Sequence, residues 1–200
     1  MARPRRSEEN RQRLIAQGVE LLSVQGYHGT GIQQVLDAVN VPKGSFYNYF
    51  KSKEDFAAEV IRSYTDADLA PLEALLKTPG IDGLTALKRF FEAFIAAAEA
   101  DGYRKGCLLG NMAAEASEVG EIVAAALRAS VQRVHDRLTE CLQQAQTEGT
   151  IRQDLPADTL ADLLLDTFEG SLLHMKVAKS VAPVREALRL SLDVLLRPQS

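Results

Sequence analysis

The chain has 200 residues, which suits one large domain or a small head fused to a larger body. Hydrophobic residues make up 46% and charged residues 25%, a composition typical of an ordinary globular protein. No apolar run reaches the ~18 residues that a membrane-spanning helix needs. The basic start of the chain lacks the apolar stretch of a signal peptide, and two cysteines do not make a disulfide framework, so we expect a cytoplasmic protein.

The net charge of −4 by itself argues against a nucleic-acid-binding protein, but the charges are unevenly distributed. Residues 1–53 hold 8 basic and 4 acidic side chains, whereas residues 54–200 hold 15 basic and 23 acidic ones. A positive head on an acidic body is expected where only the head meets phosphate groups.

The first two helices of the head follow from their end signals. A helix is predicted to begin at Ser7 and to end at Gly26. Thr30 and Gln33 then fit a capping box, which predicts a second helix of about eight residues. Its apolar side chains recur at helical spacing: Ile32, Val35, Leu36 and Val39.

A third short helix is predicted at about 42–49, with Pro42 at its first position. Phe46 and Phe50 lie four residues apart, so one face of this helix is expected to pack into the head. A second capping box at Ser52–Asp55 begins a long helix that runs towards Lys77. Three short helices with a tight turn between the last two are the helix-turn-helix arrangement, in which the third helix enters the major groove of DNA.

The outward face of the third helix carries groups suited to that groove. Lys43 supplies positive charge, and Gly44 lets the backbone approach closely. Ser45, Tyr47 and Asn48 present hydrogen-bond donors and acceptors.

The rest of the chain also predicts helices, at about 82–100, 119–147, 156–179 and 183–197, with a shorter one ending near Ser117. Their apolar positions recur at helical spacing, and glycine and proline interrupt the chain only between them. We therefore predict an all-α fold of about nine helices. A helix-turn-helix head spans residues 1–53, and an antiparallel helical body for effector sensing and dimerisation spans residues 54–200.

The segment Val41–Glu54, together with Thr30–Ile32, Val35 and Ala38, closely resembles the recognition region of the TetR family of transcriptional regulators. The resemblance implies a homodimeric repressor that binds a double-stranded DNA operator and is released by a small-molecule effector. It implies DNA contacts from Lys43, Gly44, Ser45, Tyr47, Asn48 and Tyr49, and phosphate contacts from Thr30, Gly31 and Lys53. Asn48 stands where the family commonly has histidine, and this difference puts the operator sequence in question. The basic segment from Arg3 to Arg13 is either disordered or an arm that reaches DNA.

One segment of the body predicts chemical reactivity. Cys107 precedes or opens a helix and follows Arg104 and Lys105, and both features favour the nucleophilic thiolate. Cys141, in the middle of an apolar helix face, is expected to be structural. Gly106–Leu108 and the pair Ala114-Glu115 resemble a TetR branch that includes the repressor of N-ethylmaleimide reductase and regulators of acrylate use. That branch implies sensing of electrophiles, oxidants or small unsaturated acids, with Lys176 near the cysteine.

An apolar effector pocket is the other expectation for the body, again because the family has one. Its candidate lining is aromatic: Tyr64, Phe91, Phe94, Tyr103 and Phe168. Apolar stripes on the last two helices predict either an intramolecular core or a four-helix dimer interface. The stripes contain Leu160, Leu163, Leu164, Phe168 and Leu172, followed by Val184, Leu188, Leu192 and Leu195.

The preferred interpretation is a DNA-binding repressor without a cofactor or a metal. His28, His135 and His174 show no metal-binding spacing. Three alternatives stay open at this point: a sensor of a reversible ligand that makes no use of cysteine chemistry, a thiol redox enzyme built on Cys107, and an activator instead of a repressor. The enzyme would lack a Cys-x-x-Cys pair and would leave the head unexplained.

Overall fold

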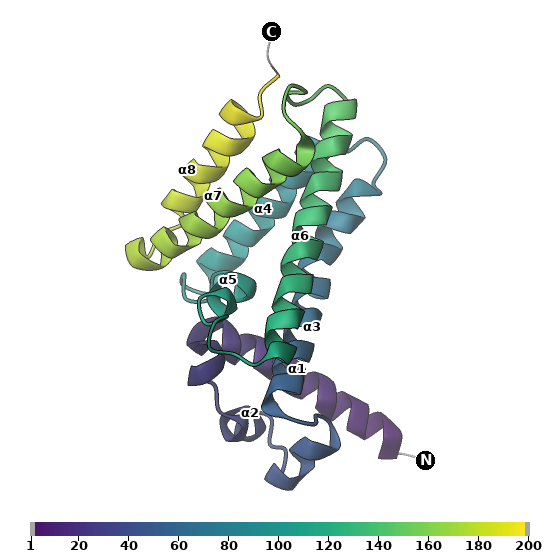
Figure 1. The fold of residues 1–200 in the computed structure, drawn as a ribbon, viewed down its shortest axis with the longest axis vertical. Coiled ribbons are helices and arrows are strands. Elements are labelled where there is room, and N and C mark those ends of the chain that lie inside the picture. Colours follow the sequence, from purple (N-terminus) through teal and green to yellow (C-terminus); the bar gives the residue numbers. More distant parts are fainter. Residues whose placement is uncertain (1–2, 199–200) are drawn as a thin grey trace. The chain divides into compact units, whose positions relative to one another are not determined.

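The computed structural model describes residues 3–198, and within them the fold is all-α (Figure 1). Eight α-helices and two shorter helical segments occur in this range, which contains no strand. The predicted fold class is confirmed. No helix in the described range is long and apolar enough to span a membrane.

The chain divides into two compact units, each made of segments that are distant in sequence. Unit 1 comprises residues up to Asp66 together with Cys107–Ser130, and unit 2 comprises Ala67–Gly106 and Val131–Ser200. The helices α3 (Lys53–Leu76) and α6 (Glu121–Thr147) each contribute residues to both units. Unit 1 thus combines the predicted head with the chain that follows Cys107.

Unit 1 begins with α1 (Arg3–Gly29), which starts earlier than the predicted Ser7. The predicted break at Gly26 is present as a kink, because its φ of 70° is not helical. The chain continues into α2 (Ile32–Ala38) and the 3₁₀ helix η1 (Lys43–Asn48). The side chains of residues 3–6 lie outside what the structure describes, so the proposed basic arm stays a prediction.

Three phenylalanines form the centre of the head core. Phe46, Phe50 and Phe56 are 0–2% exposed, and their ring centroids lie 4.9–5.7 Å apart. The predicted burial of Phe46 and Phe50 is therefore confirmed. Such aromatic contacts add to the free energy gained by burying the rings.

Two details of the second and third helices differ from the prediction. Pro42 is the N-cap of η1, one residue before the helix begins, and Ser45 N–H donates to the Pro42 carbonyl over 2.8 Å. The predicted capping box at Thr30 is absent, and that prediction is wrong. Gly31 is the N-cap of α2, without a side-chain cap, while the Gln33 amide donates to Asp37 and not back along the chain. The prediction failed because the Thr30 hydroxyl donates instead to the Gly26 carbonyl, four residues earlier in the chain.

The Ser52 half of the second predicted capping box is confirmed at the start of α3, while Asp55 reaches back to Lys51 and not to Ser52. Ser52 Oγ accepts from the backbone N–H of Asp55 over 3.0 Å, and the Asp55 carboxylate accepts from Lys51 N–H. These bonds use donors that a helix start would otherwise leave unpaired.

Unit 2 contains α4 (Gly83–Ala100), α7 (Ala157–Ala178), α8 (Ala182–Arg189) and the π-helical segment η2 (Leu190–Leu195). A short connection lets α8 turn back along α7 (Figure 1). Most of the apolar stripe predicted on these helices is core of unit 2, since it is buried within the chain. The buried members are Leu160, Leu164, Phe168, Leu172, Val184, Leu188 and Leu192.

The stripe ends one residue later than predicted. Leu196 is 1% exposed, whereas Leu195 is only half-buried. The cause is the wider π-helical turn of η2, in which Leu196 N–H donates to the Ser191 carbonyl five residues earlier, over 3.0 Å.

Candidate functional site

The outward face of η1 carries the predicted DNA-reading side chains. Tyr47 is 68% exposed, and Lys43, Gly44 and Asn48 are also exposed. Ser45 and Tyr49 are half-buried. The buried side of η1 fixes this face, because the Phe46 ring packs against Phe50 and Phe56 in the core of the head.

The turn that precedes η1 is held from α1. Asn40 takes a left-handed conformation with φ 55°, which asparagine tolerates better than most residues. The Arg13 guanidinium donates to the Val39 carbonyl over 2.9 Å. The sequence analysis places Arg13 in a basic segment at the start of the chain. Its hydrogen bond to a carbonyl 26 residues away could not be predicted from the neighbouring sequence.

Thr30 and Gly31, predicted to meet phosphate, differ in exposure. Thr30 is 2% exposed, and its hydroxyl donates to the Gly26 carbonyl over 2.8 Å. Gly31 is exposed at the start of α2. Of this pair, only Gly31 is therefore exposed to solvent, while the Thr30 N–H donates to the Tyr27 carbonyl over 3.4 Å.

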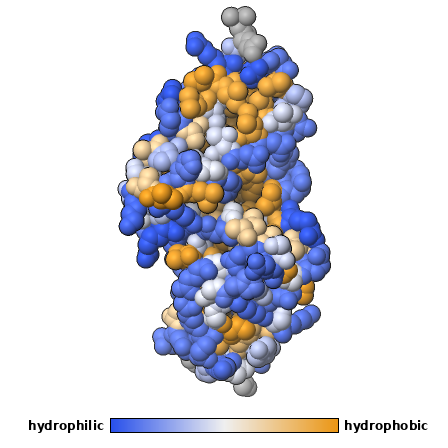
Figure 2. Space-filling model, turned by 60° about the vertical axis from the view of Figure 1, so that its left-hand side comes forward, coloured by the Kyte–Doolittle hydropathy of each residue, from blue (hydrophilic) through white to orange (hydrophobic). Residues whose placement is uncertain are grey.

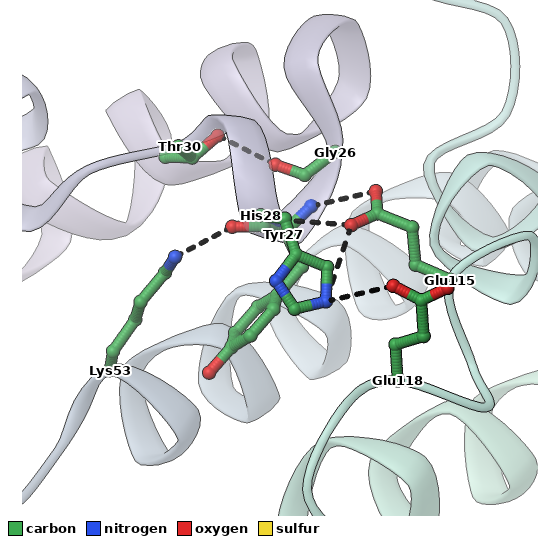
Figure 3. Close-up of polar contacts among 7 residues, drawn as sticks. All are labelled: Gly26, Tyr27, His28, Thr30, Lys53, Glu115 and Glu118. Atoms are coloured by element: carbon green, nitrogen blue, oxygen red, sulfur yellow. Dashed lines mark hydrogen bonds and ion pairs between the residues drawn. The ribbon is translucent and has the colours of Figure 1, made fainter.

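The half-buried Lys53 side chain points toward the Tyr27 carbonyl (Figure 3). Its ammonium donates to the Tyr27 carbonyl over 2.7 Å and lies 4.3 Å from the centre of the Tyr27 ring. Burial lowers the pKa of Lys53, while the Glu115 carboxylate opposes this shift. The predicted phosphate contact would have to compete with these two interactions.

Cys107 is the N-cap residue of the short helix α5 (Leu108–Ala113) and is half-buried. The Tyr64 hydroxyl, from α3, donates a hydrogen bond to its Sγ over 3.8 Å. A donor at this position stabilises a thiolate more than a thiol. Sequence reasoning placed Tyr64 in an effector pocket, because spacing along the chain does not reveal a contact across 43 residues.

Lys176 lies over Gly106, the residue directly before Cys107 in the chain. A Cβ on Gly106 would be 2.9 Å from Lys176 Cε and 3.4 Å from Nζ, so glycine at 106 allows the lysine side chain to pass. Gly106 also has a φ of +68°, a conformation that glycine adopts without strain. Arg104, one of the two cations predicted to flank the cysteine, donates from its guanidinium to the Asp101 backbone carbonyl.

The aromatic residues predicted to line a pocket fall into separate groups. Phe168 contacts Phe91 and Phe94, with ring centroids 4.9 and 5.0 Å apart, and these three form a cluster in unit 2. Tyr103 is half-buried, with a φ of 65°, directly after Gly102. Tyr64 belongs to unit 1, beside Cys107.

A second apolar set on the last helices remains at the surface. Exposed hydrophobic side chains occur on α7 at Leu163, Leu173 and Val177, and on η2 at Leu190 and Val194. Figure 2, which brings the α7–α8 side of Figure 1 forward, shows hydrophobic side chains at the surface. Leu163 was predicted to belong to the buried stripe, and that prediction is wrong because its side chain is 43% exposed; the other four residues lie outside the predicted stripe.

Metal ligation has no support in the described part of the chain, where no group of three or more histidine, cysteine or acidic side chains is arranged to hold an ion. The head thus has a buried core of three phenylalanines. A tight turn leads into η1, whose outer face exposes Lys43, Tyr47 and Asn48. This is the class of helix-turn-helix DNA-binding regulators.

Comparison with known proteins identifies the family. The profile described as "Bacterial regulatory proteins, tetR family" matches residues 14–60, and "Tetracyclin repressor-like, C-terminal domain" matches residues 83–191. The chain belongs to the TetR family of transcriptional regulators. It is a transcriptional repressor and not an enzyme, because the matching families and relatives are regulators, and this excludes the thiol redox alternative.

Three relatives are informative. The repressor DhaR of Mycobacterium sp. strain GP1 is 32% identical over 93% of this chain and 92% of its own length. The regulator AcuR of Cereibacter sphaeroides is 30% identical over 89% and 81%. The crystal structure of the reduced form of E. coli NemR has a TM-score of 0.82 at 26% identity, covering 92% of this chain and 95% of that one. The branch suggested by the Cys107 segment is thereby supported.

Proposed function

We propose that this repressor is released from a palindromic operator when an electrophile or an oxidant reacts with Cys107. The observation that carries the proposal is the hydrogen bond from Tyr64 to the Cys107 sulfur, because it favours the reactive thiolate. Lys176, on α7, lies over Gly106, the residue that precedes Cys107 in the chain. The likeness to NemR, whose structure is described as a reduced form, supports a redox-responsive thiol.

The reaction with an unsaturated carbonyl compound is an addition. The thiolate forms a bond to the β-carbon, the electron pair of the double bond moves to the α-carbon, and that carbon takes a proton from water. No other reactant is required. The product is bulkier than the thiol and can no longer carry the negative charge that Tyr64 stabilises.

The DNA-binding part of the proposal assigns base and backbone contacts to Lys43, Gly44, Ser45, Tyr47, Asn48 and Tyr49. Gly31, with Thr30, would meet phosphate through backbone N–H groups, and Lys53 would have to leave Tyr27 to do the same. A repressor with these contacts acts on chromosomal DNA, in the cytoplasm.

The test of DNA reading uses a duplex selected from random-sequence DNA by binding to the full-length protein. Lys43→Ala and Tyr47→Ala are each expected to weaken binding of this duplex by about tenfold or more. The control is Lys51→Ala, an exposed lysine beyond η1, which should change affinity little. Unchanged affinity in both η1 variants would refute the assignment.

The test of the sensor adds N-ethylmaleimide or hypochlorite to the protein–DNA complex and follows release by fluorescence anisotropy. Wild type should release the duplex, while Cys107→Ser should retain it. Tyr64→Phe should react several-fold more slowly, because it loses one hydrogen bond to the thiolate. Equal release in wild type and Cys107→Ser would refute the cysteine mechanism. It would favour a reversible ligand that binds near the cluster of Phe91, Phe94 and Phe168.

We also propose that the repressor is a homodimer whose interface uses the exposed apolar residues of α7 and η2. An apolar surface on two adjacent helices from each subunit would form a four-helix interface. Two heads related by twofold symmetry would then read the two halves of a palindromic site.

A further inference from the structure

The end of α1 contains a turn whose backbone groups are paired by residues from three other segments. Gly26 leaves the helical conformation, with φ 70°, so the helix is interrupted three residues before its end at Gly29. Residues after such a break behave like a new helix start, with backbone N–H groups that lack partners within the helix. The donors concerned are the N–H groups of Tyr27 and His28.

Glu115 accepts from both of these donors (Figure 3). Its Oε1 lies 3.0 Å from Tyr27 N and its Oε2 lies 2.9 Å from His28 N. The carboxylate thus acts as a capping group that comes from a segment about 90 residues away. Its side chain is only 24% exposed, so water competes weakly for these bonds.

Gly26 makes this approach possible. A Cβ at residue 26 would lie 1.8 Å from Glu115 Oε1, well inside any contact distance. Any other residue would both strain the positive φ and expel the carboxylate. The glycine and the glutamate are therefore interdependent.

The carbonyl side of the turn is paired as well. Lys53, the first residue of α3, donates to the Tyr27 carbonyl over 2.7 Å. Thr30, which leads into α2, donates to the Gly26 carbonyl over 2.8 Å. A negative charge at the N–H groups and a positive charge at a carbonyl complement the dipole of the turn.

A second contact joins the α5 region to α1. Asn111, within α5, donates from its side-chain amide to the Ser23 carbonyl over 2.7 Å. Asn111 and Glu115 are four and eight residues after Cys107, so one short segment connects the cysteine to the last turns of α1. All these residues belong to unit 1.

We propose that Glu115 is a positioning residue for DNA binding. By capping the turn at Tyr27 and His28, it fixes the exit from α1 into α2, and hence the placement of α2 and η1. Loss of the capping contact lowers the fraction of molecules in which the head is arranged to bind DNA, and the apparent affinity falls by the same factor. Modification of Cys107 would disturb the Glu115 contact through the connecting helix α5. This step alone rests on the proposed sensor function.

The test compares Glu115→Gln and Glu115→Ala with the control Glu118→Gln. Glu118 is 74% exposed, lies 3.9 Å from His28 and caps neither N–H group. Glutamine retains an oxygen that can accept one hydrogen bond, so we expect about tenfold weaker binding of the selected duplex for Gln and a larger loss for Ala. Glu118→Gln should bind as wild type does.

Amide hydrogen exchange followed by NMR on the full-length protein separates positioning from general destabilisation. The Tyr27 and His28 N–H groups should exchange about tenfold faster in Glu115→Gln, with unchanged protection in the core of unit 2. Affinity is measured where circular dichroism shows every variant folded; if Glu115→Ala does not fold, Glu115→Gln decides. Affinities equal to wild type in the folded Glu115 variants would overturn the proposal.

The Cys107→Ser background distinguishes this proposal from the sensor. Glu115→Gln should weaken DNA binding there as strongly as in the parent, without any electrophile. If electrophiles fail to release wild type while Glu115→Gln still binds weakly, the sensor proposal is wrong and the positioning role stands. If electrophiles release wild type while Glu115→Gln binds normally, the positioning role is wrong and the sensor stands.

Discussion

At the scale of single residues, the two cysteines differ in what surrounds them. Cys141 is fully buried, and burial raises its pKa to about 12, so almost no thiolate forms near neutral pH. Cys107 is half-buried, with the Tyr64 hydroxyl as a donor to its sulfur. The expected structural role of Cys141 agrees with its burial.

We therefore expect iodoacetamide at pH 8 to modify Cys107 at least about a hundredfold faster than Cys141, because the thiolate is the nucleophile. Mass spectrometry of peptides from the folded protein measures both rates. Unfolding in guanidinium should make the two rates similar, which serves as the control. Comparable rates in the folded protein would contradict the assignment of Cys107 as the reactive thiol.

Asp68, on α3 within unit 2, provides a pH-dependent prediction. Desolvation raises its pKa from 3.8 to about 6, because burial penalises the charged form. An acid with a raised pKa in the folded state loses its contribution to stability as the pH rises through that value. The ionised side chain is thus a destabilising element at neutral pH.

Asp68→Asn should therefore raise the free energy of unfolding at pH 7.5 and change it little at pH 4. Because the side chain is only half-buried, we expect a gain of about 1–2 kcal/mol and not the full value of the shift. Urea unfolding at both pH values measures this. Asp66→Asn, an exposed carboxylate two residues earlier, is the comparison, and an equal gain there would argue against burial as the cause.

At the scale of elements, local rules work where the partner of a capping group is close in sequence. Asp82 is the N-cap of α4, and it accepts from the backbone N–H and the hydroxyl of Thr85 over 2.8 and 2.6 Å. Hydrogen bonds from Thr85 hold the pKa of Asp82 below its usual range. The stability from this cap is present at neutral pH and is lost as the pH falls through the lowered pKa.

Asp82→Ala is accordingly expected to lower the free energy of unfolding by about 1 kcal/mol at pH 7, the usual cost of losing an N-cap. The difference from wild type should shrink as the pH falls through the lowered pKa of Asp82, because the carboxyl is then protonated and accepts these hydrogen bonds less strongly. Glu92→Ala, at an exposed position in the same helix, should change stability by no more than about 0.5 kcal/mol. Urea unfolding across this pH range measures the three proteins.

Elsewhere, a different local hydrogen bond replaced the predicted pattern within an element. Thr30 matches the N-cap pattern, yet its hydroxyl pairs with Gly26 and leaves the capping position to Gly31. The π-helical turn of η2 shifts the buried stripe to Leu196. In both cases a hydrogen bond to a residue four or five positions earlier decides the outcome, and the sequence pattern did not single out that acceptor.

At the scale of the whole molecule, the exposed apolar side chains of α7 and η2 lead to a prediction about assembly. Leu173 is 63% exposed and Val177 is 87% exposed, which is unusual for such side chains unless another surface covers them. Replacing Leu173 with glutamate would bury a charge in the proposed dimer interface, and this is costly.

Leu173→Glu should therefore convert the proposed dimer to a monomer at micromolar concentration, as measured by light scattering after size-exclusion chromatography. It should also weaken operator binding, because a monomer offers one reading head to a palindromic site. Ile122→Glu, at a 52% exposed apolar residue of α6, is the matched control and should remain dimeric. Dimers in both variants would contradict the assigned interface.

Much of this protein follows from its sequence alone. Helical spacing of apolar residues, glycine and proline breaks and the capping box at Ser52 predict the order of the helices, and the dense motif at Val41–Glu54 predicts the family. These features are local, since each depends on residues within one or two helical turns. The tertiary structure decided what pairs the groups that local rules leave open: Tyr64 with Cys107, Lys53 with Tyr27, and Glu115 with the turn at Gly26. Those partners are 26 to 88 residues apart, and only the packing of the folded chain brings their polar groups within hydrogen-bond distance.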